Sequence, residues 1–524
     1  MAWLKLTENL TMIRKIVKYT KKLPGKIFQK TKKILKKSES FIERKIERNL
    51  ILTKHYKTEE MSISDLMLIQ SDHEELLRWD IIVRYLAIEN YYGKNDYGWE
   101  LYRKMQKIRI CDGYEEQAVE QFKNLIGSYE KSGYDKSSGI LVDKNLHLID
   151  GSHRIALALY HGIPNITVNI VKTRHPVEYS VDWFLMNGFS YEEIHRIKEK
   201  YVEIFSGLDK CFTCIIWAPA VSLVKNISED IALYADIISE KEYCYESGTY
   251  DNIVKALYSV DDIEKWKIDK KIEHMKGYDP RLIKLDLLFK DPKFRIKNSS
   301  GLPLSQQAEK IKKTLRKKYS SYIADYYFDI ILHIGDNVYQ SMYMNHVLNE
   351  DIDFTKLIDI LDKYTYAFVK IDVPYMPSDF PLSIPVCKDA DILCLENELN
   401  YISQEVFETY KNIDGFTTYR IEEKNGSRIR IQWGKTLYYQ IDLSFAAKGM
   451  DRSYVKDALD ARIKSDKGYY ILAPAYEYVY RANSYAQNPQ KLQHKKYLQE
   501  HAHEMDSDMI TKYCNVDINK ILNK

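Results

Sequence analysis

Apolar residues recur at helical spacing over much of the first third of the chain. From about Met61 to Arg109 this spacing predicts helices, and residues 115–133 predict one more. Two short apolar runs follow in "SGILVDKNLHLIDG", and the Lys144-Asn145 pair between them predicts a two-residue hairpin turn. A helix from Ser152 and a strand at "ITVNIV" complete a stretch in which helices and short strands alternate.

The hydrophobic pattern changes twice further along the chain. Residues 181–350 are predicted to be mostly helical, with one strand near Cys214 and a buried strand in "FDIILHIGDN". After Asp351 the runs "YAFVKIDVP", "DADILCL", "RIRIQWG" and "YYQIDLSF" predict strands, and two helical stretches close the chain. We therefore expect a multidomain α+β protein. Its expected parts are a basic amphipathic arm (1–57), a small α+β domain with a helical N-terminal extension (58–180), a mostly helical middle region (181–350) and a C-terminal α/β domain (351–524).

Charged residues are unevenly distributed along the chain. The 524 residues are too many for one ordinary core. Their net charge is +3, but residues 1–54 hold 16 Lys and Arg against 4 Glu, so that this arm carries +12 and the remainder −9. Within the arm, Ile13, Ile16 and Val17 stand at helical spacing between lysines. Such a segment can lie on an anionic membrane surface, form a solvated tail or, the least favoured of the three, track nucleic-acid phosphates.

Two further features of the sequence bear on location. No apolar run approaches the ~18–20 residues that a membrane span needs, and the N-terminus lacks the compact apolar core of a signal peptide. The seven Cys residues form no disulfide framework, and Cys211 and Cys214 fit an ordinary strand. We therefore expect a cytoplasmic protein in a reducing compartment, with peripheral contact between residues 1–54 and the inner face of the membrane.

Polar residues meet an apolar strand in "LIDGSHRIALALY", where a helix is predicted to begin. The first backbone N–H groups of a helix lack partners and favour an anion. Gly151 allows close backbone approach, Ser152 suits the N-cap, and Arg154 offers a forked donor for phosphate oxygens. His153 can donate to phosphate or accept a proton, and Asp150 can hold a metal ion or a substrate hydroxyl. The alternative is a plain capped helix with an exposed His and Arg.

The span 115–171 resembles the ParB/sulfiredoxin fold. The likeness rests on an acidic helix "EEQAVEQFKNLIGSYEKSG", a strand "GILVD", the turn and helix "LHLIDGSHRIALALYHGI" and a last strand "IPNITVNIV". Members of this family bind a nucleotide at the turn. Some hydrolyse CTP while clamping DNA, and others phosphorylate a sulfinic acid or free serine. The resemblance implies that residues 151–154 bind the phosphates of ATP or CTP.

A kinase of this family also needs a carboxylate base near the acceptor hydroxyl. Glu89 in "AIENYYGKN" is the first candidate and Asp150 the second, with His153 as a further catalytic group. A DNA-clamping member would carry a helix-turn-helix module next, but "GFSYEEI" is followed by no convincing recognition helix. The sequence thus favours phosphotransfer to a small molecule over chromosome partitioning.

Three aspartates form the second group of candidate residues. Asp389 and Asp391 stand at i and i+2 in "SIPVCKDADILCL", so that strand alternation sends both side chains to one face. Asp442 ends the strand "YYQIDL". Carboxylates this close need a cation, and Mg²⁺ prefers oxygen ligands. Three acids on neighbouring strands would hold Mg²⁺ against a triphosphate, whereas the alternative is that the first two acids only flank a strand in a solvated turn.

Residues 364–500 are similar to the nucleotidyltransferase fold in its divergent bacterial branch. There a strand bearing a lysine precedes the Asp-x-Asp strand, a third acid follows on a later strand, and a helix rich in Lys and His ends the domain. The resemblance implies that "FVKID" supplies Lys370 for the nucleotide phosphates and that "NPQKLQHKKYL" supplies Lys491 and His494. Ile371-Asp372 stands where the family carries Gly-Ser, which is a departure from the way the family cradles a triphosphate.

Together these features predict a bifunctional phosphotransfer enzyme. One part would be an NTP-dependent kinase of a small hydroxylated acceptor, and the other a Mg²⁺-dependent nucleotidyltransferase. Such a pair would serve the synthesis of a surface polysaccharide precursor, an expectation taken from the families alone. The competing hypothesis is a nucleotide-gated, ParB-like DNA-binding protein, and a third is an interaction scaffold with degenerate folds. The sequence names neither the acceptor nor the nucleotide, and it gives residues 181–350 no function.

Overall fold

The computed structural model divides the chain into two compact units. The first comprises the described residues up to Cys211 together with residues 289–309 and 336–339, and the second comprises residues 212–288, 310–335 and 340 onward. The basic arm of residues 1–54 lies outside the described residues. The structure describes residues 56–72, 75–76, 78–109, 113–135, 139–172, 178–261, 263–297, 300–327, 329–349, 352–447, 449–451, 453–504 and 506–513.

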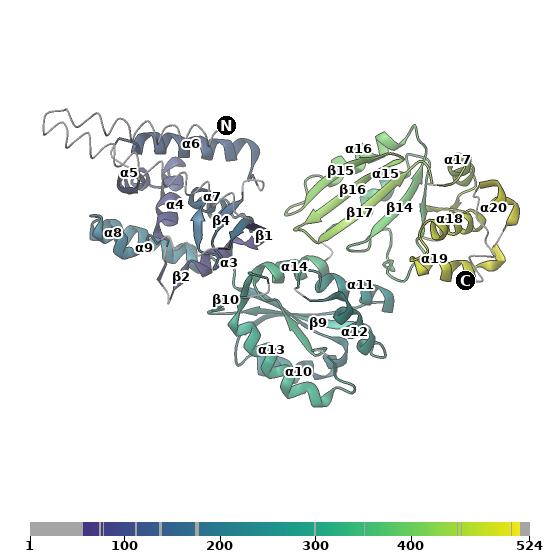
Figure 1. Ribbon diagram of the computed structural model, residues 1–524, viewed down its shortest axis with the longest axis horizontal. Helices are drawn as coiled ribbons and strands as arrows, with labels where there is room; N and C mark the ends of the chain where they lie inside the picture. The colour runs from purple at the N-terminus through teal and green to yellow at the C-terminus, as the bar shows by residue number, and fades with distance from the viewer. Residues whose placement is uncertain are drawn as a thin grey trace. The chain divides into compact units, whose positions relative to one another are not determined.

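A four-stranded mixed sheet lies in the first unit, in the order β1-β6-β4-β5 (Figure 1). β6 runs antiparallel to β1 and parallel to β4, and β5 is antiparallel to β4. Two short hairpins, β2–β3 and β10–β11, accompany it. The strands are β1 (Tyr56–Ser62), β2 (Ser71–Asp72), β3 (Glu75–Leu76), β4 (Ile140–Val142), β5 (Leu148–Asp150), β6 (Asn165–Val171), β10 (Phe294–Ile296) and β11 (Pro303–Ser305).

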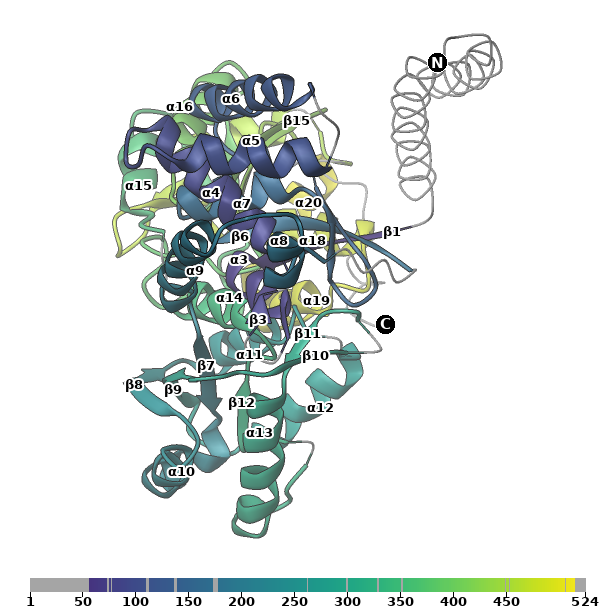
Figure 2. The ribbon, with the colours of Figure 1, turned by 90° about the vertical axis from the view of Figure 1, so that its left-hand side faces the viewer.

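Helix α4 is central to this unit and packs against α5, α7 and α9 (Figure 2). Its apolar side chains are buried on nearly every side, because partners surround it, so it shows no simple two-faced pattern. The helices of the unit are α3 (Ile63–Ile69), α4 (Trp79–Tyr91), α5 (Gly98–Arg109), α6 (Glu115–Ser132), α7 (Ser152–Tyr160), α8 (Val181–Met186) and α9 (Tyr191–Ser206).

The predicted hairpin between β4 and β5 is present, but its loop is longer than expected. The backbone N–H of Asp143 donates to the carbonyl of His147 at 2.9 Å, so the loop comprises residues 144–146. Leu146 ends the loop in a left-handed conformation with φ 64°. The buried carboxylate of Asp143 accepts hydrogen bonds from the N–H groups of Asn145 and His147. The predicted turn at Lys144-Asn145 is present, because the N–H of Leu146 donates to the carbonyl of Asp143 at 2.9 Å, but Leu146 adds a third residue to the loop.

The second unit contains a four-stranded sheet in the order β12-β7-β9-β8. β7 and β12 lie where strands were predicted, whereas β8 and β9 fall in a stretch that was expected to be helical. β8 is an edge strand whose side chains are mostly exposed, four of the nine being charged, so it lacks the apolar alternation that signals a strand. The strands are β7 (Cys211–Ile216), β8 (Asp236–Cys244), β9 (Arg281–Leu288) and β12 (Leu332–Ile334). The accompanying helices are η2 (Ala218–Leu223), α10 (Val224–Ile231), α11 (Ser247–Leu257), α12 (Lys265–Met275), α13 (Gln306–Tyr319), η3 (Ser320–Tyr322) and α14 (Val338–Leu348).

A seven-stranded sheet follows in the order β15-β16-β17-β14-β13-β19-β18. β14 runs antiparallel to β13 and parallel to β17, while β16 is antiparallel to both β15 and β17. All four strands predicted from the sequence after Asp351 are present. The strands are β13 (Tyr366–Val369), β14 (Asp389–Cys394), β15 (Thr417–Glu423), β16 (Gly426–Trp433), β17 (Leu437–Ser444), β18 (Ile463–Lys464) and β19 (Tyr470–Ile471).

Two groups of helices border this sheet (Figure 1). α16 packs on β15 and β16, with α15 beside it. α17 packs on β14, and α18 contacts α19 and α20. Ala367, Val369 and Leu393 share a buried cluster with the second group, so these helices border the face to which Leu393 points. The helices are α15 (Thr355–Leu361), α16 (Leu399–Tyr410), α17 (Ser453–Asp460), α18 (Pro474–Gln487), α19 (Leu492–Glu500), η4 (Ala502–Glu504) and α20 (Ser507–Tyr513).

The chain is thus a mixed α+β protein with more than one compact unit, as the sequence predicts. In the described part of the chain, no helix has both the length and the apolar content that a membrane crossing requires.

Candidate functional site

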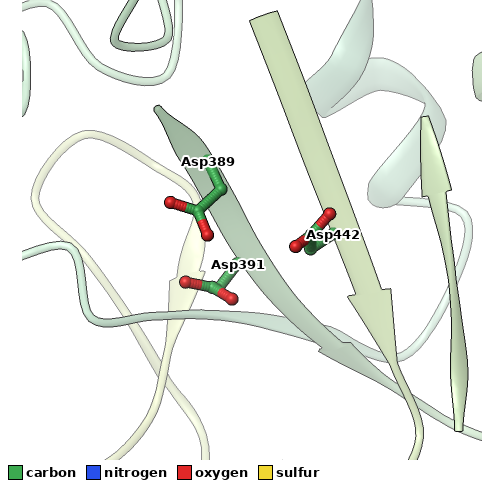
Figure 3. Close-up of side chains that lie close together, drawn as sticks. All are labelled: Asp389, Asp391 and Asp442. Atoms are coloured by element: carbon green, nitrogen blue, oxygen red, sulfur yellow. The ribbon is translucent and has the colours of Figure 1, made fainter. Parts of the chain in front are cut away.

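Polar side chains line one face of the seven-stranded sheet. Along β17, Gln440 and Asp442 alternate with buried apolar residues, and strand alternation therefore places both on the same face. The register pairs Asp389 with Gln440 and Asp391 with Asp442 across parallel strands. Figure 3 shows the three carboxylates on neighbouring strands, close to one another. The predicted acidic cluster is therefore present as a geometric feature.

The three carboxylates lie close enough to hold one cation. Each of Asp389, Asp391 and Asp442 offers an oxygen within 4.8 Å of the others, and all three side chains are partly buried. Burial raises the pKa of Asp391 above its usual value, with Asp389 adding to the rise and Lys370 opposing it. An all-oxygen set on rigid strands fits Mg²⁺, which prefers hard oxygen ligands.

Lys370 neutralises part of this charge. Its Nζ lies 2.7 Å from Oδ2 of Asp391. Burial opposes the charged ammonium, but Asp391 raises the pKa of Lys370 above its usual value. The residue follows β13 in a left-handed conformation, φ 57°, and its backbone N–H donates to Glu477 at 2.9 Å. A non-glycine residue held in this region stores strain, which is typical of functional positions.

Arg428 forms a second ion pair, which the sequence did not indicate. Its Nε and Nη2 donate to the two oxygens of Asp442 at 2.8 and 2.9 Å, and the amide of Gln440 donates to the same carboxylate at 3.2 Å. This pairing raises the pKa of Arg428. Asp389 forms no hydrogen bond or ion pair with any described residue. Three carboxylates against two cations leave a charge of −1, which favours a further cation.

Residues of helices α18 and α19 lie close to Lys370. Arg481, fully buried, donates through Nε to Glu477 at 2.6 Å and through Nη1 to the carbonyl of Asp372 at 3.2 Å. His494 is 1% exposed, and burial followed by the charges of Lys370 and Arg481 lowers its pKa to about 3. The structure therefore brings His494 into the neighbourhood of Lys370 as a neutral ring.

The turn at residues 150–154 has a different geometry from the one expected. Gly151 takes φ 112° and is itself the N-cap of α7, so the prediction that Ser152 is the N-cap is wrong. A Cβ on Gly151 would meet the Ile140 side chain at 3.1 Å. Ser152 is buried, donates to Oδ2 of Asp80 at 3.0 Å and accepts from Nη2 of Arg78 at 2.9 Å. Its hydroxyl thus holds the turn onto α4.

The side chains of His153 and Arg154 also contact the protein. His153 Nε2 lies 2.8 Å from the hydroxyl of Tyr102, and its ring packs edge-on against Phe122 at 4.5 Å. Burial, with help from nearby arginines, lowers its pKa well below the usual value, so the ring is neutral. Arg154 donates to the carbonyl of Gly139 at 3.0 Å and lies 3.9 Å from Asp150. His153, Arg154 and Asp150 are all partly buried, so the predicted alternative of a fully exposed His and Arg does not describe this turn.

Glu89 does not lie at this turn. It is on α4, nine residues after Asp80, which places it roughly 13 Å further along the helix axis. Its carboxylate pairs instead with Lys200 of α9 at 2.9 Å. The structure therefore separates this candidate base from the residues that were expected to bind phosphate.

Buried charges beneath the turn were not predicted. Asp80 is fully buried and accepts from Arg78 at 2.8 Å and from Arg84 at 2.9 Å. Burial alone would raise the pKa of Asp80, but Arg78 and Arg84 hold it far below its usual value. The buried Nε atoms of Arg84 and Arg109 have no hydrogen-bond partner among the described residues. Positive charge thus exceeds negative charge behind α7.

Comparison with known proteins gives no family for this chain. No protein-family description matches the sequence, and no curated protein is detectably similar to it. A functional assignment therefore depends on the chemistry of the two sites.

Proposed function

We propose that the C-terminal part of the chain is a Mg²⁺-dependent nucleotidyltransferase. One observation carries the proposal, which is the set of three carboxylate oxygens within 4.8 Å of one another beside a strained, partly buried lysine. The fold of this part is proposed to be a divergent nucleotidyltransferase fold. The parallel pairing of β14 with β17, which brings Asp391 opposite Asp442, supports it.

Each residue of the site has a definite task in this reaction. Asp389, Asp391 and Asp442 hold the metal, and bound Mg²⁺ supplies neutralisation of the triphosphate charge. Lys370 leaves Asp391 for the phosphate oxygens, and Arg428 keeps Asp442 in one orientation. An acceptor hydroxyl oxygen then attacks the α-phosphorus, the bond to the bridging oxygen breaks, and pyrophosphate leaves with the electron pair. The hydroxyl proton passes to a carboxylate of the site and then to water.

Isothermal titration of the full chain with MgCl₂ tests this proposal. We expect one site in the wild type, loss of at least about tenfold in affinity in Asp391→Asn, and an unchanged site in Asp466→Asn. Asp466 is an exposed acid in the same part of the chain, so it controls for a general loss of negative charge. Equal Mg²⁺ binding by the wild type and Asp391→Asn would remove the site.

Nucleotide-phosphate binding at the start of α7 is a second candidate function, as part of an NTP-dependent kinase. The excess of buried positive charge behind the turn favours it, since the first N–H groups of α7 already favour an anion. Binding of ATP and CTP, measured by calorimetry for the wild type and Arg154→Ala, tests this candidate. Unchanged affinity in the folded variant would end it.

A further inference from the structure

A cavity of about 390 Å³ lies in the second unit between α11 and the segment of residues 375–386. This volume falls within the range of about 300–1,000 Å³ that is usual for small-molecule sites. Its remaining walls come from the end of α14, the residues before α15 and Tyr439 of β17. The unit that holds the acidic cluster therefore also holds a separate, formed cavity.

The two main walls are fixed to each other. Gly248, in the first turn of α11, approaches Pro374 so closely that a Cβ would lie 2.0 Å from its carbonyl oxygen. Asn252, one turn further, donates from Nδ2 to the carbonyl of Val386 at 2.9 Å. The cavity is therefore bounded by packed backbone rather than by loose side chains.

The lining has a distinctive chemistry. Its charged members are Glu246 and Asp379, both acidic, and none of the lining residues is Lys, Arg or His. Aromatic rings and apolar side chains alternate with hydroxyl groups over the remaining surface. A triphosphate would be repelled here, because its charges would find no cation. Carboxylates that accept from hydroxyl groups, beside rings that cover C–H faces, suit a neutral polyol.

Tyr375 and Val386 connect the cavity to the start of β14, the strand that carries Asp389 and Asp391. Tyr375 lines the cavity. The ammonium of Lys388, the residue before Asp389, lies 4.9 Å from the centre of the Tyr375 ring. Val386 also lines the cavity and precedes Asp389 by one short stretch of chain. Tyr439 alternates with Gln440 and Asp442 along β17, so this wall of the cavity lies on the sheet face opposite the acids, and a ligand would reach them around the start of β14.

We propose that this cavity binds the acceptor of the transfer reaction, a neutral polyhydroxylated compound such as a sugar or an alditol. The role of the bound compound as acceptor rests on the proposed function, whereas its binding in the cavity does not. One hydroxyl of the bound polyol would supply the oxygen that attacks the α-phosphorus. Pyrophosphate would be the leaving group, and the hydroxyl proton would pass to a carboxylate of the acidic cluster and then to water.

Saturation-transfer NMR on the full chain, without nucleotide, tests the assignment with glycerol, ribitol and glucose as probes. We expect at least one of them to bind, and ribitol 5-phosphate to bind at least about tenfold more weakly than ribitol if ribitol is the ligand. Ser378→Trp, at an exposed lining position, should abolish the signal, whereas Ser321→Trp, an exposed serine outside the lining, should keep it. Thermal unfolding of both variants checks that each is folded.

Each result separates this inference from the proposed function. If none of the three polyols binds, or if Ser378→Trp leaves binding unchanged in a folded protein, the acceptor site is wrong even where Mg²⁺ binds normally. If Ser378→Trp does not fold, Asp379→Asn gives a second comparison, because Asp379 is one of the two charged residues of the lining and should weaken polyol binding when neutralised. If polyol binding follows the expectation while Asp391→Asn leaves Mg²⁺ binding unchanged, the cavity stands and the nucleotidyltransferase proposal fails.

Discussion

Lys370, the residue after β13, lies 2.7 Å from Asp391 of the neighbouring antiparallel strand β14, so that the chain provides its own cation for a carboxylate expected to bind metal. Metal and lysine therefore compete for the same oxygen. Lys370→Met should tighten Mg²⁺ binding by up to about tenfold, because Asp391 loses its competitor. The same change should lower nucleotide turnover by about 10²–10³-fold, because a donor to the phosphates is lost.

Calorimetry with MgCl₂ and a pyrophosphate-release assay measure the two effects on one protein sample. Weaker Mg²⁺ binding in Lys370→Met would contradict the competition. Lys411→Met, a change at an exposed lysine of the same unit, should alter neither quantity.

Activity should depend on the forked side chain of Arg428 and not only on its charge. Arg428→Lys cannot hold both oxygens of Asp442, so the carboxylate loses its fixed orientation and activity should fall about 10–100-fold. Arg430→Lys is the matched control, since Arg430 is the next residue on the same face of β16 and donates to the neutral Gln440. Pyrophosphate release measures both variants, and an equal loss in the two would refute a specific role for the Arg428 fork.

Removal of the buried charge of Asp80 should destabilise the first unit strongly. Asp80→Asn leaves Arg78 and Arg84 buried without a counter-charge, which costs about 3–5 kcal/mol in the free energy of unfolding. Glu116→Gln breaks an exposed pair with Arg103 and should cost less than about 1 kcal/mol. Urea unfolding followed by circular dichroism compares the two, and a similar small loss in both would show that Asp80 is not the required counter-ion.

Because of Asp65, the free energy of unfolding should fall as pH rises towards neutrality. Burial raises its pKa from 3.8 to about 7, although the N–H groups of Val338 and Tyr339 oppose the rise. Between these two values the folded chain holds a proton that the unfolded chain has released. The free energy of unfolding should therefore decrease between pH 4 and 7, by up to about 1.4 kcal/mol per pH unit from this group.

Asp65→Asn should remove this part of the pH dependence, as measured by urea unfolding at a series of pH values. Asp353→Asn, a change at an exposed residue whose carboxylate accepts from the first N–H of α15, should leave the window from pH 4 to 7 unaltered. A wild-type stability that rises across that window, with no difference in Asp65→Asn, would rule out a raised pKa.

The sequence predicted those features that depend on local spacing. The i, i+2 placement of Asp389 and Asp391 sufficed to put both on one face, and the strand that carries Asp442 was correctly located, although it continues beyond Asp442 to Ser444. The partner of Asp442 could not be predicted, because the register that sets Arg428 opposite it depends on how two strands align. A comparison of the alternation in "RIRIQW" and "YYQIDL" would have indicated only that both strands carry a polar face.

The residues around α7 show where local reasoning failed. His153 looked exposed because the letters on either side are polar, but Tyr102 and Phe122 reach it from helices far earlier in the chain. Glu89 was chosen for its residue type, whereas helix length carries it away from the turn. Asp80 and Arg84 stand at i and i+4, a spacing that indicates a helical ion pair, but nothing in the sequence indicates that this pair and Arg78 are buried.

The first unit includes residues from much later in the chain. Ile296 and Leu302 pack against its core, and the carboxylate of Asp65 holds the start of α14 at Val338 and Tyr339. During synthesis on the ribosome this unit must therefore wait for more than half of the polypeptide before its last contacts can form. A fragment that ends near Cys211 would lack Val338 and Tyr339, whose N–H groups donate to Asp65, and would expose part of that core. Useful truncations therefore have to retain residues 289–339.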